Sequence, residues 1–162
     1  MNGAMLHLWI NHLPVFGLAF GLFLHLTAIY LKSEEWKNAA LVLYVATALG
    51  TIPVYVTGEP AEHVVRGMPE VDREQIDPHQ DWGTASLVAI EGLGIASLAG
   101  LFLARRNARL SAVLTGGSLA LAVLSFAIVA WTAHLGGMIH HPEDRPGFVV
   151  PPRPPGRDRP AE

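Results

Sequence analysis

The stretch LSAVLTGGSLALAVLSFAIVAWTAHL, residues 110–135, contains no Asp, Glu, Lys or Arg. A helix needs about 20 mostly apolar residues to cross the roughly 30 Å hydrocarbon layer of a membrane. A soluble helix of this length would carry charged side chains along one face, and this stretch does not. It therefore predicts a transmembrane helix.

Three further stretches have the same character: residues 13–31, which begin to be apolar near Leu6, residues 39–56 and residues 83–104. Only His25 and Glu91 place an ionisable group in the interior of a predicted span, away from its ends. The chain is 51% apolar and 15% charged, whereas soluble domains are about 25% charged. We therefore predict an all-α fold, an integral membrane four-helix bundle with up-down topology that forms one domain over residues 1–141.

The segments outside the four spans differ in character. Residues 59–76 are polar with spaced Val and Met, which predicts a short interfacial helix or loop on the membrane surface. Residues 142–162 are rich in Pro and Arg and are predicted to form an extended or disordered tail. Small residues repeat every fourth position at Gly17 and Gly21, and again at Gly92, Ala96 and Gly100. This spacing favours close packing between membrane helices.

Basic residues predict how the chain lies in the membrane. The first and third connectors are short and basic; they contain Lys32, Lys37, Arg105, Arg106 and Arg109. Cytoplasmic loops carry an excess of Lys and Arg, so both connectors are predicted to be cytoplasmic. The expected location is the bacterial inner membrane, with several passes, both termini in the periplasm and the lipid bilayer as the main partner.

Several functional classes have no basis in the composition. The chain has no cysteine, which excludes disulfides, iron–sulfur clusters and covalently attached haem. Lys and Arg are few and scattered, so no nucleic-acid partner is expected. No Gly-x-Ser-x-Gly or His-Glu-x-x-His motif of a hydrolase occurs. Whether the protein is an enzyme stays open.

Histidine is the residue whose distribution is informative. Because the spans alternate in direction, seven of the eight histidines are predicted at one end of the bundle. These are His7, His12, His63, His79, His134, His140 and His141. Neutral imidazole is the commonest ligand of transition metals and haem iron where cysteine is absent. His12 is the strongest candidate, because Pro14 frees the carbonyl of Ile10 and kinks the helix beside it.

Carboxylates accompany the histidines. Gly58 and Pro60 end the second span, which would place Glu59 near His12. Gly136 and Gly137 are expected to loosen the end of the fourth span, so that His141 and Glu143 fold over the same end. Glu91 is predicted roughly 12 Å inside the third span at 1.5 Å per residue, as a proton-path or quinol-binding candidate.

Four short motifs resemble a largely uncharacterised bacterial family of small four-helix integral membrane proteins. They are Asn-His-x-Pro from Asn11, Thr-Gly-Glu-Pro-Ala-Glu from Thr57, the histidine that opens the third helix, and Thr-Ala-x-Leu-Gly-Gly-x-Ile-x-His-x-Glu from Thr132. The resemblance covers nearly the whole chain up to Glu143, and the histidines are placed as in b-type cytochromes. It implies site positions at His12, Glu59, His79, His141 and Glu143, but no activity. Asn and Arg often stand in that family where this chain has His134 and His140.

Three functions remain open at this point. The first is an electron-transfer protein that binds haem b near the outer face and relays electrons between quinol and a partner, with His12, His79, His134 and His141 as candidate ligands. The second is a site for an iron, zinc or copper ion that uses His12, Glu59, His79, His141 and Glu143. The third is a cofactor-free accessory subunit of a respiratory or photosynthetic complex.

Overall fold

The computed structural model describes residues 3–68, 71, 73–103 and 106–150. Every regular element in these ranges is helical. The four long helices are α2 (Leu13–Leu31), α3 (Glu34–Val56), α5 (Ile76–Leu103) and α6 (Ala108–His140). Two short helices, α1 (Gly3–Ile10) and α4 (Gly58–Val65), extend α2 and α3 at one end, and the 3₁₀ turns η1 (Arg73–Gln75) and η2 (Pro142–Asp144) precede α5 and follow α6.

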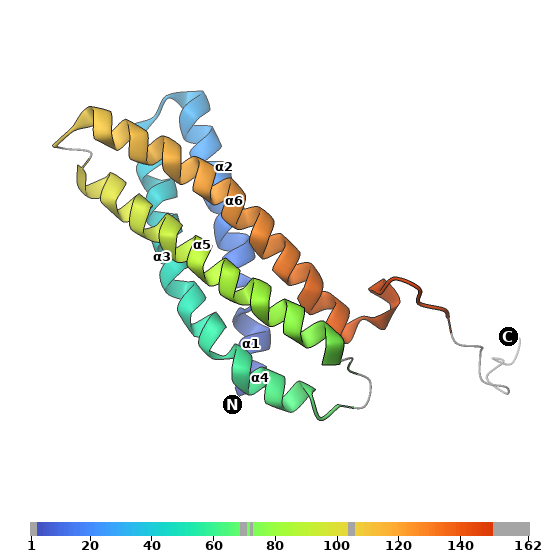
Figure 1. The fold of residues 1–162 in the computed structure, drawn as a ribbon. Coiled ribbons are helices and arrows are strands. Elements are labelled where there is room, and N and C mark those ends of the chain that lie inside the picture. Colours follow the sequence, from blue (N-terminus) through green and yellow to red (C-terminus); the bar gives the residue numbers. More distant parts are fainter. Residues whose placement is uncertain (1–2, 69–70, 72, 104–105, 151–162) are drawn as a thin grey trace, which may run out of the picture.

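Successive long helices run antiparallel around a common core, as Figure 1 shows. α2 packs against α3, α3 against α5, α5 against α6, and α6 back against α2. Buried apolar residues from all four, including Leu18, Leu41, Ile90 and Val129, form the core. The predicted all-α four-helix bundle is therefore confirmed.

The four helices are long and apolar enough to cross a membrane. With their short extensions, the candidate spans are Gly3–Leu31, Glu34–Val65, Ile76–Leu103 and Arg109–His140. Large apolar side chains also point outward, among them Phe20 on α2, which is 62% exposed, and Phe102 on α5, which is 73% exposed. An outer surface of this kind is typical of contact with lipid or with other membrane helices.

The helices are longer than the apolar stretches that predicted them. α5 begins at Ile76, so that Asp77 lies in its first turn, where a negative charge interacts favourably with the helix dipole. α6 continues through Gly136 and Gly137 to His140, so the prediction of a loosened helix end at these glycines was wrong. Beyond the end of α6, the Arg145 guanidinium donates to the carbonyls of Met138 and Ile139 over 2.8 and 3.1 Å.

The break between α1 and α2 lies where Pro14 predicts it. Residues 11 and 12 form a turn, and Pro14 lies in the first turn of α2. Proline has no N–H to donate to the carbonyl of Ile10, so the helical ladder is interrupted there. The turn is closed by a bond from the Asn11 N–H to the His7 carbonyl over 2.9 Å.

The predicted small-residue contacts are confirmed on α2 and shifted on α5. A Cβ on Gly17 would lie 2.3 Å from Thr47 Oγ1, and a Cβ on Gly21 would lie 2.3 Å from Tyr44 Cε1. On α5 the closest approach is at Gly94, whose Cβ would lie 2.5 Å from that of Ala48, whereas Gly92 has no atom within 4 Å of that position. α3 therefore approaches α2 and α5 through glycines that admit no side chain.

The C-terminal region is described only in part. Beyond η2, residues 145–150 form a bend, a turn and an irregular segment. The remainder of the predicted tail, residues 151–162, lies outside the described residues.

Candidate cofactor site at the histidine end

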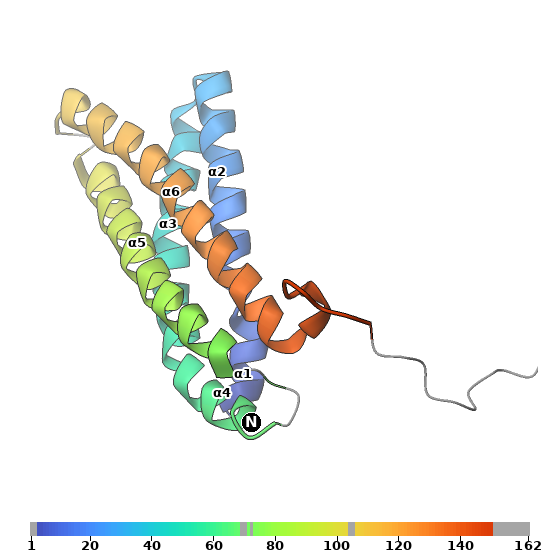
Figure 2. The ribbon, with the colours of Figure 1, turned by 45° about the vertical axis from the view of Figure 1, so that its right-hand side comes forward.

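One end of the bundle is formed by α1, α4, the start of α5 and the end of α6. We call it the histidine end, and it is the lower end in Figure 2. α1 and α4 pack side by side there. A Cβ on Gly3 would lie only 2.4 Å from that of Pro60, which shows how closely the two helices approach. α1 and α4 therefore form a close pair at this end.

Most of the side chains that the sequence predicts as site residues are exposed at this end. The exposed group consists of His12, Glu59, His134, His141 and Glu143. The ring centroid of His12 lies 6.4 Å from that of Phe16, and the ring centroid of His134 lies 5.4 Å from that of Trp131. Among the described residues, no three His, Asp or Glu side chains are grouped so that they could hold a metal ion.

His141 and Glu143 are the predicted pair that the structure brings into contact, with His141 Nδ1 3.0 Å from Glu143 Oε1. A bond from the backbone N–H of Glu143 and the bond from His141 lower the pKa of the Glu143 carboxyl. Because this pKa is depressed, the contact stabilises η2 above the ordinary pKa of glutamate, and that stabilisation is lost as the pH falls through the depressed value.

The His141→Ala substitution removes the side-chain bond from residue 141 and leaves the backbone bond in place. We expect the pKa of Glu143 to rise toward the ordinary glutamate value and not to reach it, since the backbone bond remains. A ¹³C NMR titration of the Glu143 carboxyl measures this. An identical titration curve in the variant and the parent protein would show that the contact is absent in solution.

His79 is fixed by α6. Its ring is half-buried, and Nδ1 lies 3.0 Å from the backbone carbonyl oxygen of Thr132. Gly136 lies one turn beyond Thr132, and a Cβ there would be 2.9 Å from His79 Cε1. The Thr132 hydroxyl also bonds to Ser86 Oγ and to the Trp82 carbonyl, over 2.8 and 3.1 Å. The His79 ring is therefore clamped against a bare section of the α6 backbone.

His7 on α1 has an equivalent arrangement. Its half-buried ring places Nδ1 3.0 Å from the carbonyl oxygen of Val54 and 3.2 Å from Thr57 Oγ1. Val54 lies in the last turn of α3, where carbonyls have no helical partner. The break between α3 and α4 at Thr57 therefore provides the acceptor that orients His7.

The two rings share a chemical state. A carbonyl oxygen can only accept, so Nδ1 carries the proton in both bonds and Nε2 presents a lone pair. Within the described residues, neither ring uses Nε2 in a hydrogen bond. A charge on His79 acts on His7, and both rings lie at the histidine end. A histidine bound to a backbone carbonyl through one nitrogen is the usual arrangement of a ligand that binds iron or zinc through the other.

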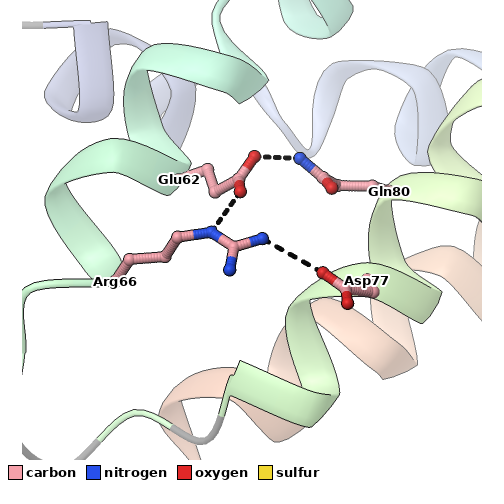
Figure 3. Close-up of polar contacts among 4 residues, drawn as sticks. All are labelled: Glu62, Arg66, Asp77 and Gln80. Carbon is pink, nitrogen blue, oxygen red and sulfur yellow. Dashed lines mark hydrogen bonds and ion pairs between the residues drawn. The ribbon is translucent and has the colours of Figure 1, made fainter.

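A polar network ties α4 to the start of α5, as Figure 3 shows. Glu62 bonds to Arg66 one turn along α4 and to Gln80 on α5, and Arg66 Nη2 lies 3.1 Å from Asp77 Oδ1. These contacts hold α4 over the start of α5. Glu59, three residues before Glu62, points away into an exposed position.

Glu91 lies farther from this end than predicted. α5 begins at Ile76 rather than near Gly83, so Glu91 is roughly 22 Å along the helix at 1.5 Å per residue. Its side chain is partly exposed on the outer surface, and Oε1 is buried without a partner. Glu91 therefore lies at mid-bundle and is not part of the histidine end.

Sequence reasoning did not predict that the His7 ring is held by the end of α3. The residues that hold the ring, Val54 and Thr57, lie just before Gly58 at the end of α3. No local sequence pattern links that segment to residue 7.

Comparison of the chain with protein-family models, with curated proteins and with solved structures finds no match.

Proposed function

We propose that the protein is an integral membrane electron-transfer protein that binds haem b at the histidine end, with Nε2 of His7 and His79 as the two axial ligands. The observation that carries the proposal is that each ring has Nδ1 3.0 Å from a helix carbonyl oxygen, which leaves Nε2 available as a ligand. Helix-bundle cores are common haem sites.

The number of available ligands favours haem over a bare metal ion. A structural or catalytic zinc or iron ion takes at least three protein ligands, and no such group of three occurs in the described part of the chain. Haem iron needs only one or two axial ligands, because the porphyrin supplies the other four. Two half-buried imidazoles are therefore sufficient for haem and insufficient for a typical ion site.

The geometry favours a different partner for His79 than the sequence did. His12 lies in the turn between α1 and α2, and its ring is exposed. His134 and His141 are exposed as well. His7, one turn before the α1–α2 break, has a ring that another helix orients, and a charge on His79 acts on it.

The same proposal includes an orientation in the bacterial inner membrane. Lys32, Lys37, Arg106 and Arg109 gather at the end opposite the histidines, which favours that end as cytoplasmic and both termini as periplasmic. Haem at the outer face would then relay electrons between quinol in the membrane and a periplasmic partner.

Asparagine substitutions test the ligands. The amide nitrogen of Asn takes roughly the place of Nδ1 in histidine, so His79→Asn and His7→Asn keep a donor for the helix carbonyl and lose only Nε2. We expect either variant to insert and fold while its haem content falls close to zero, as measured by the reduced-minus-oxidised spectrum. His134→Asn is the matched control at an exposed histidine and should keep full haem content. Haem retained in both ligand variants would refute the assignment.

A second candidate function is an accessory subunit of a respiratory or photosynthetic complex that holds no cofactor. The observation that favours it is the outward position of glycines on α5 and α6. At Gly83, Gly92, Gly116 and Gly117 a Cβ would meet no atom within 4 Å. Bare backbone on an outer helix face lets a neighbouring membrane helix approach closely. Two results together would favour this function. The purified chain would show no haem spectrum, and it would copurify with defined respiratory subunits.

A further inference from the structure

A second set of polar side chains lies inside the bundle, away from the histidine end. We call His25, Tyr44, Ser97 and Ser118, one from each long helix, the buried polar layer. The exposed fraction is 1% for His25 and 0% for the other three. Within the described residues His25 Nδ1, Tyr44 OH, Ser97 Oγ and Ser118 Oγ have no hydrogen-bond partner.

Contacts between the helices place α2, α3 and α5 at one level. The Tyr44 ring lies against Gly21, and its centroid is 5.9 Å from that of His25, one turn farther along α2. On α5, Gly94 faces Ala48, which lies one turn from Tyr44, and Gly100 faces Leu41. Ser97 lies between these two glycines and therefore at the level of Tyr44.

The contacts of Gly100 also place α6. A Cβ on Gly100 would lie 3.8 Å from the Cβ of Leu114, and Ser118 is one turn beyond Leu114 on the same face of α6. Ser118 is fully buried. All four polar side chains therefore lie within about one helical turn of each other along the bundle axis.

The layer differs from the threonine hydroxyls that bond within their own helices, although the Ser125 and Thr115 hydroxyls also have no partner among the described residues. The hydroxyls of Thr47, Thr51 and Thr132 donate to the carbonyl four residues earlier in their own helix, over 2.8, 2.8 and 2.9 Å. The Tyr44 phenol and the His25 imidazole extend too far from their own backbone for such a bond. Burial of a polar group without a partner is costly, and the cost is greatest where no solvent can reach.

The chemistry of the four side chains defines what satisfies them. The phenol and the two serine hydroxyls each donate and accept, and neutral imidazole does so through its two nitrogens. Their partner must therefore be small, uncharged and able to bond in several directions at once. Water meets these requirements, and buried water typically makes about three bonds to such groups.

We infer that the buried polar layer binds a cluster of water molecules that joins the four helices and exchanges protons with the imidazole of His25. Tyr44 on α3 is the titratable side chain beside His25, and Lys37 in the first turn of α3 is the charge that acts on it. α5 and α6 contribute Ser97 and Ser118, which do not titrate. The layer is thus a proton-binding site in the half of the bundle opposite the histidine end. Its proton binding does not depend on whether haem binds at the histidine end.

The sign of a stability change tests the inference. If the layer is dry, Tyr44→Phe and Ser118→Ala each remove an uncompensated polar group and raise the midpoint of thermal unfolding. If water bridges the groups, each substitution lowers the midpoint. The midpoint of the double variant then falls by less than the sum of the two single decreases, because both side chains bond to the same water. We expect the second result. Tyr30→Phe, at a side chain that is 85% exposed, is the matched control and should change nothing.

A measurement on the parent protein does not depend on the variants folding. In full-length ¹⁵N-labelled protein in liposomes, we expect water-edited solid-state NMR to transfer magnetisation from water to the His25 ring nitrogens, identified by their loss in His25→Gln. The protonation of that ring should follow the pH of the sample. A His25 ring that receives no transfer and keeps one neutral tautomer across the pH range would overturn the inference.

Discussion

Gly94→Leu is expected to push α3 away from α5 and to lower the free energy of unfolding by about 3 kcal/mol, at the upper end of the usual cost of overpacking. The Cβ of any residue at 94 would lie 2.5 Å from the Cβ of Ala48. Neither atom is the tip of a flexible side chain, so the strain can be relieved only if the helices separate. Helical circular dichroism followed through unfolding in mild detergent measures the loss.

Gly92→Leu is the matched control on the same helix. No atom lies within 4 Å of a Cβ at this position, and leucine has a better helix propensity than glycine by nearly 1 kcal/mol. The control should therefore be as stable as the parent or slightly more so. Equal losses in the two variants would show that α3 and α5 do not meet at Gly94.

The second large effect is expected at Gly136, where α6 meets the His79 ring. A Cβ at 136 would lie 2.9 Å from His79 Cε1 and 3.2 Å from Nδ1. Gly136→Leu must therefore displace the ring and break its bond to the Thr132 carbonyl. Under the proposed function, the haem content falls close to zero while the helical content is kept, because the ring moves more easily than the two helices.

Gly137→Leu is the control for this variant, since a Cβ at 137 has no neighbour within 4 Å. It should retain haem in full, as measured by the same difference spectrum. Loss of haem in both variants would point to a general effect on the end of α6 rather than to His79. Retention in both would show that the His79 ring does not hold the cofactor.

The main features of the fold were predictable because they follow from short-range properties. Uninterrupted apolar stretches define the four long helices, and Pro14 and Gly58 mark the breaks that separate α1 from α2 and α3 from α4. The helix ends were less predictable. The first turns of α5 are polar, so hydropathy does not reveal them. The last turn of α6 follows two glycines that were expected to loosen the helix, and its carbonyls bond to Arg145.

The gathering of histidines at one end was predictable, whereas the two ligands proposed here were not. Alternating helix direction places the histidines at one end, and His79 was identified correctly as a residue of that end. His7 and His12 could not be ranked from sequence, because the Val54 carbonyl that orients His7 is distant in the chain. The kink at Pro14, which made His12 the favoured candidate, also leaves its ring exposed.

The reduced-minus-oxidised optical spectrum of the parent protein, purified in mild detergent from cells able to make haem, tests the central claim most directly. The proposed bis-histidine site predicts a sharp α-band and a shifted Soret band, with about one haem for each chain. A flat spectrum from folded protein that was expressed with haem supplied would contradict the electron-transfer function.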